Sequence, residues 1–426
     1  MKSFSAIKII QPLGEFYLTS LPVSLLLKVS FTTQLTLKQN NIFVGHQRRR
    51  DEKRIHEIAN YLQSQDAVLP GTIILAANCN EDGEILYANG ENEQDRWTVT
   101  EEQSISSPPS IVTINIPSEK KLAAVVDGQH RLWGFEELPE KLKDICLPCA
   151  VFLDLPTPQQ AMVFATINFN QKPVSKSQSY ELFGYNLDEE PEESWSPDKL
   201  AVFFARKLNV DEDSPFRNHI KVAAQDDRIL ADIIKADQKI WAISMATIVE
   251  GILSLITSSP KKDRDLLHRY PLEARSRKKI LSSEKSNAPF RDFYLSENRD
   301  IVIYKTVQNY FNAVEGLFWN NIRPGSRTLI RKTAGIQALF RVLKELLPAQ
   351  LETKDLSVEA WRSKLIVAKG KLNFEASIFT ESSGKGKTRI QDAILVMIGE
   401  KKLSAVKDDA LKKHLETVLQ GGLHAE

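Results

Sequence analysis

The 426-residue chain changes its hydrophobic periodicity near residue 198, and this change limits the folds that it can adopt. Before that point, short β-rich runs are bounded by Gly, Pro, Asn or Asp, which is typical of strands. These runs are residues 16–18, 30–37, 72–77, 110–116, 122–126 and 145–155. Between them, apolar residues recur at the i, i+3, i+4, i+7 spacing of one buried helical face, which predicts a helix over residues 50–65.

Beyond residue 198 the apolar residues follow a helical period. The predicted helices include residues 229–256, 300–319, 327–347 and 390–398, and polar breaks interrupt them at 268–287 and 381–389. The acidic, Pro-containing run at 188–198 is typical of a solvated linker. We therefore predict an α+β protein with a domain at 1–187, a linker at 188–198 and a mainly helical region at 199–426.

The composition excludes several classes of protein. Lys and Arg number 56 against 55 Asp and Glu, so any contact with nucleic acid or an anionic surface must use a local patch. Three cysteines are too few for a disulfide framework or a four-cysteine zinc site. We find no signal-peptide pattern and no apolar run of the roughly 18–20 residues that span a bilayer. We therefore expect a cytoplasmic protein without a membrane partner.

The strongest functional signal is a strand that ends at an Asp-Gly turn. Residues 123–126 are all apolar, which predicts a buried strand, and Asp127 and Gly128 follow it directly. Glycine allows the backbone to turn sharply and to approach a ligand closely. A helix is predicted to begin immediately afterwards. Its free N–H groups and the positive end of its dipole attract an anion, so the sequence predicts a phosphate-binding turn.

The side chains around this turn suit phosphate chemistry. Arg131 offers a fork of donors that matches phosphate oxygens. His130 can donate to phosphate, or transfer a proton if its pKa lies near neutrality. Asp127 can cap the helix, orient His130 or hold a divalent metal. The alternative interpretation is an ordinary capped helix with an exposed His and Arg.

Four blocks of the sequence resemble the DGQHR-domain family, named after the five residues that begin at Asp127. Residues 126–134 resemble its signature, and residues 11–18 resemble its opening strand. Residues 54–74 resemble its helix and Pro-Gly-x-Ile strand, and residues 164–174 resemble its Phe-x-x-Ile-Asn-x-x-Gln-Lys-x-Val block. That family is similar to the ParB N-terminal and sulfiredoxin domains. The resemblance therefore implies a ParB/sulfiredoxin-like fold that places the turn against nucleotide phosphates.

The resemblance also implies individual site residues. The implied catalytic residues are Asp127, His130 and Arg131. The implied nucleotide-binding residues are Gly128, Gln129, Arg131, Arg54, Asn168, Asn170, Gln171 and Lys172. The cofactors would be ATP or another NTP, with Mg²⁺ on Asp127. Which of Arg48, Arg49, Arg50 or Arg54 makes the second phosphate contact stays open, and the polar segment 168–172 is alternatively a well-capped turn. Sulfiredoxin chemistry is excluded because Gln129 occupies the position of the required cysteine.

Local basic segments predict contacts with a nucleic-acid backbone. Their residues are Arg48, Arg49, Arg50, Arg275, Arg277, Lys278, Lys279, Lys385 and Lys387. The last two lie in a Gly-Lys-Gly-Lys-Thr segment that lacks the first glycine of a P-loop, because position 381 is Glu. Each of these segments is alternatively a solvated charged surface.

The resemblance implies a place in bacterial DNA modification or defence. One branch is the DNA sulfur-modification protein DndB, implied to bind DNA and repress its own operon. Another is the ParB-like partner of the enzyme that inserts 7-deazaguanine into DNA, for which nucleotide hydrolysis is expected. The first hypothesis is an ATPase or NTPase that acts with a DNA-modifying enzyme and DNA. The others are a DNA-binding transcriptional repressor and a nucleotide-regulated nickase or nuclease. ParB-like domains also imply a homodimer.

Overall fold

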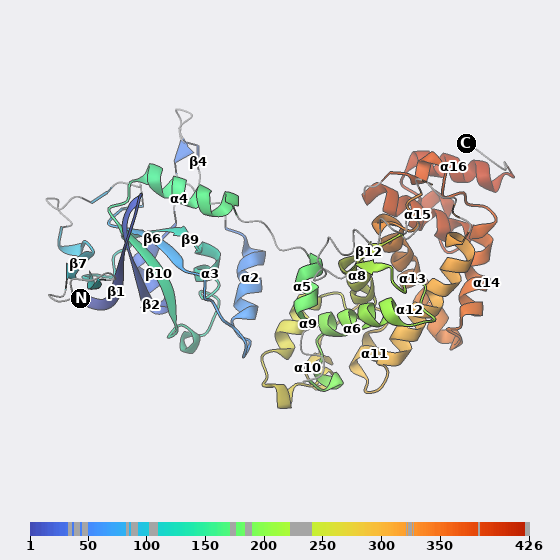
Figure 1. Ribbon diagram of the computed structural model, residues 1–426, viewed down its shortest axis with the longest axis horizontal. Helices are drawn as coiled ribbons and strands as arrows, with labels where there is room; N and C mark the ends of the chain where they lie inside the picture. The colour runs from blue at the N-terminus through green and yellow to red at the C-terminus, as the bar shows by residue number, and fades with distance from the viewer. Residues whose placement is uncertain are drawn as a thin grey trace. The chain divides into compact units, whose positions relative to one another are not determined.

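The computed structural model divides the chain into two compact units, Met1–Pro173 and Val174–Glu426 (Figure 1). It describes residues 1–426 except 33–35, 38–42, 45–49, 82–84, 87–92, 102–109, 171–175, 184–189, 222–240, 321, 323–325, 327, 382–383 and 422–426, and the side chains of 36–37, 43–44, 168–170, 178 and 181–183. The first unit is built on a sheet and the second on helices, so the predicted α+β class with a mainly helical C-terminal region is confirmed.

An eight-stranded mixed sheet forms the first unit, in the order β3-β9-β6-β10-β2-β1-β8-β7. The strands are β1 (Lys2–Gln11), β2 (Gly14–Pro22), β3 (Ser30–Phe31), β6 (Ile73–Ala77), β7 (Thr98–Glu101), β8 (Ile111–Ile116), β9 (Ala123–Asp127) and β10 (Cys146–Leu153). Strand β10 runs parallel to β6, and β3 runs parallel to β9, whereas the other pairs are antiparallel. A separate small hairpin joins β4 (Thr36–Leu37) to β5 (Phe43–Val44). All the predicted β-rich runs contain strands, but β1 and β7 were not predicted.

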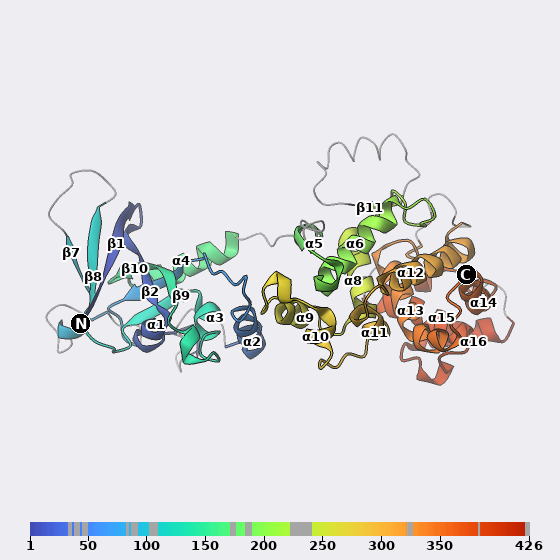
Figure 2. The same ribbon diagram turned by 90° about the horizontal axis from the view of Figure 1, so that it is seen from below.

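Helices cover both faces of this sheet. Helices α1 (Val23–Val29), α2 (Glu52–Tyr61) and α3 (Gln129–Trp133) lie over the main apolar core, which includes Val125 of β9. Helix α4 (Thr157–Asn170) lies on the opposite face, where Val163 and Phe164 pack on a smaller core. Figures 1 and 2 both place α2 and α3 toward one end of the sheet and β7 and β1 toward the other. The predicted helix at 50–65 is confirmed and begins where Asp51 caps the backbone of Arg54.

The second unit is a helical assembly. Its helices are α5 (Lys176–Phe183), α6 (Pro197–Val210), α8 (Met245–Ile256), α9 (Pro260–Leu267), α10 (Arg277–Leu281), α11 (Arg291–Leu295), α12 (Asp300–Val314), α13 (Thr333–Thr353), α14 (Val358–Lys369), α15 (Gly384–Met397) and α16 (Asp409–Leu419). A π-helical turn, Glu315–Trp319, continues α12, and two short strands, β11 (Ile220–Lys221) and β12 (Ile243–Ser244), run parallel. Gly251 of α8 lets the ring of Phe340 on α13 approach its backbone, since a Cβ there would meet Phe340 Cδ2 at 2.3 Å.

The boundary between the units differs from the predicted one. The described part of the expected linker, from residue 190 onward, is folded into the second unit. Trp195 is buried and donates its Nε1–H to the carbonyl of Glu190, while its own carbonyl accepts from the buried Tyr294 hydroxyl. Ser196 caps α6, and helix α5, expected in the first domain, packs on α6 and α8. The acidic composition suggested a solvated segment because it gives no sign that Trp195 has a buried site.

Some predicted helix boundaries also differ. Helix α8 begins at Met245, and the first part of the longer helix that we predicted, residues 229–240, lies outside the described residues. Helix α15 begins at Gly384, within the expected polar break at 381–389. The break at 268–287 contains α10 and a short 3₁₀ turn, Leu272–Ala274. Polar residues in these segments form helix caps and first turns, so they do not separate the helices as the pattern suggested.

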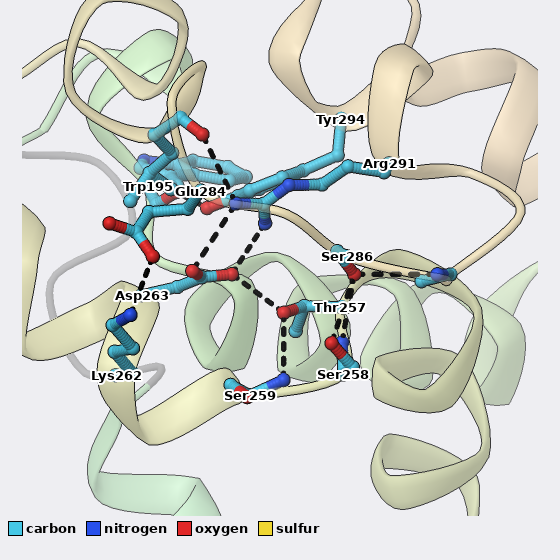
Figure 3. A network of polar contacts seen from close by, with 12 residues as sticks. Trp195, Thr257, Ser258, Ser259, Lys262, Asp263, Glu284, Ser286, Arg291 and Tyr294 are labelled. Carbon is cyan, nitrogen blue, oxygen red and sulfur yellow. Dashed lines mark hydrogen bonds and ion pairs between the residues drawn. The ribbon is translucent and has the colours of Figure 1, made fainter.

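Buried ion pairs join α9 to α11 in the second unit (Figure 3). Asp263 and Arg291 are 2% and 6% exposed, and Arg291 Nη2 donates to Asp263 Oδ1 at 3.3 Å. Asp263 Oδ2 also accepts from the Thr257 hydroxyl at 2.6 Å, at the end of α8. Arg264 lies 3.2 Å from Asp198 of α6. These contacts satisfy charges that are costly to bury alone, so each partner depends on the other.

We predict that Asp263→Ala lowers the free energy of unfolding of the second unit by about 3–5 kcal/mol, because it leaves Arg291 buried without its carboxylate. The control is Lys262→Ala on the same helix, because Lys262 pairs with Glu284 at 2.6 Å but its side chain is 56% exposed. This control is expected to cost no more than about 1 kcal/mol. Urea unfolding of both variants tests the prediction, and equal costs for the two would contradict it.

Candidate functional site

The Asp-Gly turn is a sharp strand-to-helix junction, as predicted. Strand β9 ends at Asp127, and Gly128 adopts a left-handed φ of +98° before α3 begins. Any residue other than glycine would be strained at this backbone conformation. Its Cβ would also meet Ile73 Cδ1 at 2.6 Å. No side chain caps the N-terminus of α3. Its first-turn amides are therefore not occupied by a capping side chain.

Arg131 folds back over this turn. Its Nη2 donates to Asp127 Oδ2 at 2.7 Å, and both side chains are about one quarter exposed. The guanidinium lies against two glycines, because a Cβ on Gly71 would lie 2.4 Å from Arg131 Nη1 and a Cβ on Gly128 would lie 3.1 Å from Nη2. Sequence reasoning missed Gly71 as a site residue. Its place in the resembling Pro-Gly-x-Ile block was the available signal.

Asp127 has a contact that differs from the three roles considered for it. Its carboxylate holds Arg131, and the described contacts include no cap of α3 by its side chain. Within the described residues, no group of three or more His, Cys, Asp or Glu side chains is arranged to hold a metal ion. A magnesium ion on Asp127 would therefore need phosphate oxygens and water to complete its oxygen shell.

Gln129 and His130 differ in their surroundings. The side chain of Gln129 is only 5% exposed, and its Oε1 has no hydrogen-bond partner among the residues that the structure describes. The His130 ring packs edge-on against Trp133, with 5.6 Å between the ring centroids. A buried amide oxygen without a donor is costly, so Gln129 is a candidate contact for a ligand or water that carries a donor.

A pocket of about 550 Å³ lies beside α3. Its lining residues are Leu27, Ser30, Phe31, Thr32, Arg50, Glu81, Lys121, Val125, Leu132, Trp133 and Glu136. It therefore shares β9 and α3 with the turn, although neither Asp127 nor Arg131 lines it. The lining thus combines hydroxyls, charged groups of both signs and aromatic rings. This combination suits a polar ligand that contains a planar group.

Arg50 is the arginine that the structure brings to this pocket. Its Nη2 lies 2.8 Å from Glu136, its Nε lies 2.9 Å from Glu52, and its guanidinium stacks 5.2 Å from the centre of the Trp133 ring. Burial acts to lower the pKa of Arg50, but the hydrogen bond and charge of Glu136, together with Glu52, outweigh it and raise that pKa. Arg50 is thus held as a permanent cation. Sequence reasoning had assigned it to nucleic acid and had also left it open as the second phosphate contact.

The structure describes no contact between the turn and the other expected nucleotide-binding residues, several of which lie outside the described set. The side chain of Arg54 is exposed on α2. Asn168 and Asn170 end α4, on the sheet face opposite α3, and their side chains are outside the described set. Gln171, Lys172, Arg48 and Arg49 lie outside the described residues altogether.

The expected nucleic-acid contacts divide by burial. Arg277 is 4% exposed, makes a bidentate pair with Asp300 at 3.0 and 2.8 Å, and stacks on Tyr294. It is therefore a structural residue, contrary to the prediction. Its neighbours Lys278 and Lys279 are exposed, whereas Arg275 donates through Nε to the carbonyl of Tyr270.

The Gly-Lys-Gly-Lys-Thr segment forms the first turn of α15 and not a P-loop. Lys385 is exposed and lies 3.7 Å from Asp408. Lys387 donates to Gln337 at 3.1 Å, and burial lowers the pKa of its amine. Gly386 is required because a Cβ there would meet the carbonyl oxygen of Glu381 at 1.8 Å. The glycine serves close packing of the backbone, so only Lys385 remains a surface cation.

The comparisons with known proteins identify the region that carries the turn. Residues 4–192 match the family model DndB, described as DNA-sulfur modification-associated. Over these residues the chain is similar to the DndB family. The match covers the described sheet from Phe4 onward and the Asp127–Arg131 turn, and it links the chain to DNA modification with sulfur. The comparisons with curated proteins and with solved structures found no match. Among the described residues, no helix is both long and apolar enough to cross a membrane.

We predict that Gly128→Ala destabilises the DndB-family region by more than the ~1–2 kcal/mol cost of the left-handed backbone, because its Cβ also meets Ile73. The matched control is Gly399→Ala, since Gly399 has a φ of +80° and open space around its Cβ position. It is expected to lose only the backbone cost. Thermal unfolding, followed separately for the two units, measures both. Equal losses of stability in the two variants would show that the clash with Ile73 adds nothing to the cost of the backbone conformation.

Proposed function

We propose that the DndB-family region binds ATP or another NTP at the Asp127–Arg131 turn and hydrolyses it, and that it acts with a DNA-modifying enzyme. The observation that carries this proposal is the position of Arg131, which lies over an uncapped helix N-terminus between two glycines. Backbone N–H groups and an arginine fork at one turn form a phosphate-binding arrangement. The family supplies the link to DNA modification.

The Asp127–Arg131 ion pair is compatible with phosphate binding. Ion pairs with this degree of exposure contribute only about 0–1 kcal/mol, so a phosphate can compete with the carboxylate for the guanidinium. Arg131 has five N–H donors, and Asp127 accepts from one nitrogen. Asp127 therefore positions the arginine in the absence of an anion and leaves donors for the phosphate.

The pocket beside α3 supports a nucleotide in particular. Its volume of about 550 Å³ falls within the roughly 300–1,000 Å³ of small-molecule sites. Trp133 and the Arg50 guanidinium stacked on it offer planar surfaces for a base, and the hydroxyl of Thr32 suits a ribose. The triphosphate would then extend along α3 toward Arg131. In this arrangement the nucleotide would lie near two positive charges, Arg50 at the pocket and Arg131 at the turn.

Hydrolysis requires charge neutralisation on the transferred phosphoryl group. A bound Mg²⁺ supplies part of this neutralisation, and Asp127 is the carboxylate at the turn that would hold it. Arg131, released from Asp127, would then face the phosphate alone and stabilise the charge that develops on its oxygens. His130 is the second residue after Gly128, in the first turn of α3, and is the candidate for proton transfer.

We predict that Arg131→Ala weakens NTP binding by about ten- to hundredfold, the equivalent of ~1.5–3 kcal/mol for a charged hydrogen bond. Asp127→Ala is expected to abolish Mg²⁺-dependent phosphate release while NTP binding is retained. Equilibrium binding and phosphate release are measured for each variant with and without DNA. If the wild type binds no NTP under any of these conditions, the proposal is wrong.

A subtler variant moves the Arg131 side chain without removing it. Gly71→Ala places a methyl group 2.4 Å from the present position of Arg131 Nη1, and the flexible end of the arginine can shift to accommodate it. We expect a stable protein with weakened NTP binding and slower phosphate release. Gly370→Ala is the control, because its Cβ position is open. Unchanged phosphate release in Gly71→Ala would show that the position of the guanidinium is unimportant.

The second candidate function is a DNA-binding repressor of a DNA-modification operon. The description of the family favours contact with a DNA system, and Lys278 and Lys279 on α10 are exposed cations. If they contact phosphates, Lys278→Ala/Lys279→Ala reduces the slope of log affinity against log salt by about 1.8, or ~0.9 for each lost contact. An unchanged slope would exclude α10 from the interface. Tight DNA binding without NTP binding would favour this function over hydrolysis.

A further inference from the structure

One face of the sheet in the first unit is only partly covered within its own unit. Helix α4 packs over β9 and β6 through Val163 and Phe164. The apolar surface continues past this helix, because Phe152 of β10 contacts Phe16 of β2 with 5.1 Å between the ring centroids. The side chains of α1, α2 and α3 lie on the other face. Strands β2, β1 and β8 therefore extend the smaller core into an apolar surface that no described helix of the first unit covers.

The strand register defines this surface. Ile7 pairs with Leu18 on one side and with Ile111 on the other, and Ile9 pairs with Phe16, so these residues share one face. Ile7 is 42% exposed and Ile111 is 58% exposed. We call this set of residues, Ile7, Ile9, Phe16, Leu18, Ile111 and Phe152, the outer apolar face. Contiguous exposed apolar surface of this kind marks an interaction site more often than isolated exposed residues do.

The outer face also lacks charge along its described strands. The alternating residues of β7, β8, β1, β2 and β10 that share it are Thr98, Thr100, Ile111, Thr113, Asn115, Ser3, Ser5, Ile7, Ile9, Gln11, Phe16, Leu18, Ser20, Cys146, Pro148, Ala150 and Phe152. None of these is Asp, Glu, Lys or Arg, although charged residues make up 26% of the chain. The polar residues at its rim bond to one another, since Asn115 accepts from Ser3 at 2.8 Å and donates to Thr100 at 2.7 Å.

The uncharged face of β7, β8, β1, β2 and β10, which contains the outer apolar face, has a size that fits a reversible contact between proteins. Neighbouring strands lie ~4.8 Å apart and rise ~3.3 Å per residue, so five strands over about five residues give roughly 400 Å² in projection. Two such faces together remove on the order of 800 Å² in projection, and somewhat more in accessible area. This lies at the lower end of specific interfaces, which predicts a concentration-dependent association.

We propose that the outer apolar face binds the same face of a second copy of this chain. A charge-free surface does not attract DNA phosphates, and it offers no charges to orient a different protein. Two identical uncharged faces meet without repulsion, and a twofold axis makes such a contact self-complementary. Sheets that pack face to face interdigitate apolar side chains across ~10 Å, as the Ile and Phe residues here allow. The proposal does not depend on nucleotide binding.

The test is the mass of the full chain in solution, measured by sedimentation over a range of concentrations. The wild type is expected to shift from one to two copies of 48.2 kDa as its concentration rises. Ile7→Lys/Ile111→Lys places four like charges in the paired faces and is expected to remain a monomer with unchanged thermal unfolding. Ile366→Lys is the control, because Ile366 is 51% exposed on α14 in the other unit. It is expected to associate as the wild type does.

A mixture of variants makes the test specific to this face. Ile7→Glu/Ile111→Glu is expected to be a monomer alone, and to form a 1:1 dimer when mixed with the Lys variant, because the two faces then carry opposite charges. A wild type that stays monomeric at every concentration overturns the proposal. So does a Lys variant that still dimerises, or a mixture of the Lys and Glu variants that does not form a dimer.

Discussion

The left-handed backbone of Gly128 is the constraint on which the candidate site depends. It turns the chain from β9 into α3 within one residue, so Asp127 and Arg131 face each other across the turn. Because Gly128 has no side chain, the guanidinium can lie close to the backbone, and Gly71 gives the same room from a distant segment. Two glycines and one ion pair thus fix the position of the cation, with no need for a rigid shell of side chains.

The two units bury charge differently, and this decides which basic residues remain for a ligand. The described core of the first unit is mainly apolar, and its arginines Arg50 and Arg131 are partly exposed at α3. The second unit buries Arg277 and Arg291 against Asp300 and Asp263. A basic run in the sequence therefore mixes structural and surface cations, and only burial separates them. In the second unit, Lys278 and Lys279 are examples of basic residues that stay exposed.

Much of the fold could be predicted from the sequence, because strands such as β6 and β9 carry continuous apolar runs. The turn could be predicted because its signature is local. Gly71 could not be assigned to the site in this way, and Arg50 could not be singled out among the neighbouring arginines. Their positions depend on segments that meet only in the folded sheet. The domain boundary was placed later than the structure has it because acidic residues around Trp195 suggested solvent. In the structure, the Trp195 side chain is buried and its backbone carbonyl accepts from the Tyr294 hydroxyl.

The alternation of side chains across β9 and its neighbours separates the two proposed activities. Val125 and Asp127 point toward the helices that form the pocket, and Ala124 and Val126 point toward the opposite face, which continues into the outer apolar face. A charged ligand and an uncharged second copy therefore use opposite sides of one sheet and do not compete for the same residues. Any coupling between them has to pass through the strands. Such coupling would appear as a change in the nucleotide-binding constant when the chain dimerises. The substitutions at Ile7 and Ile111 leave the turn intact, so nucleotide binding can be compared between the monomeric variant and the wild type.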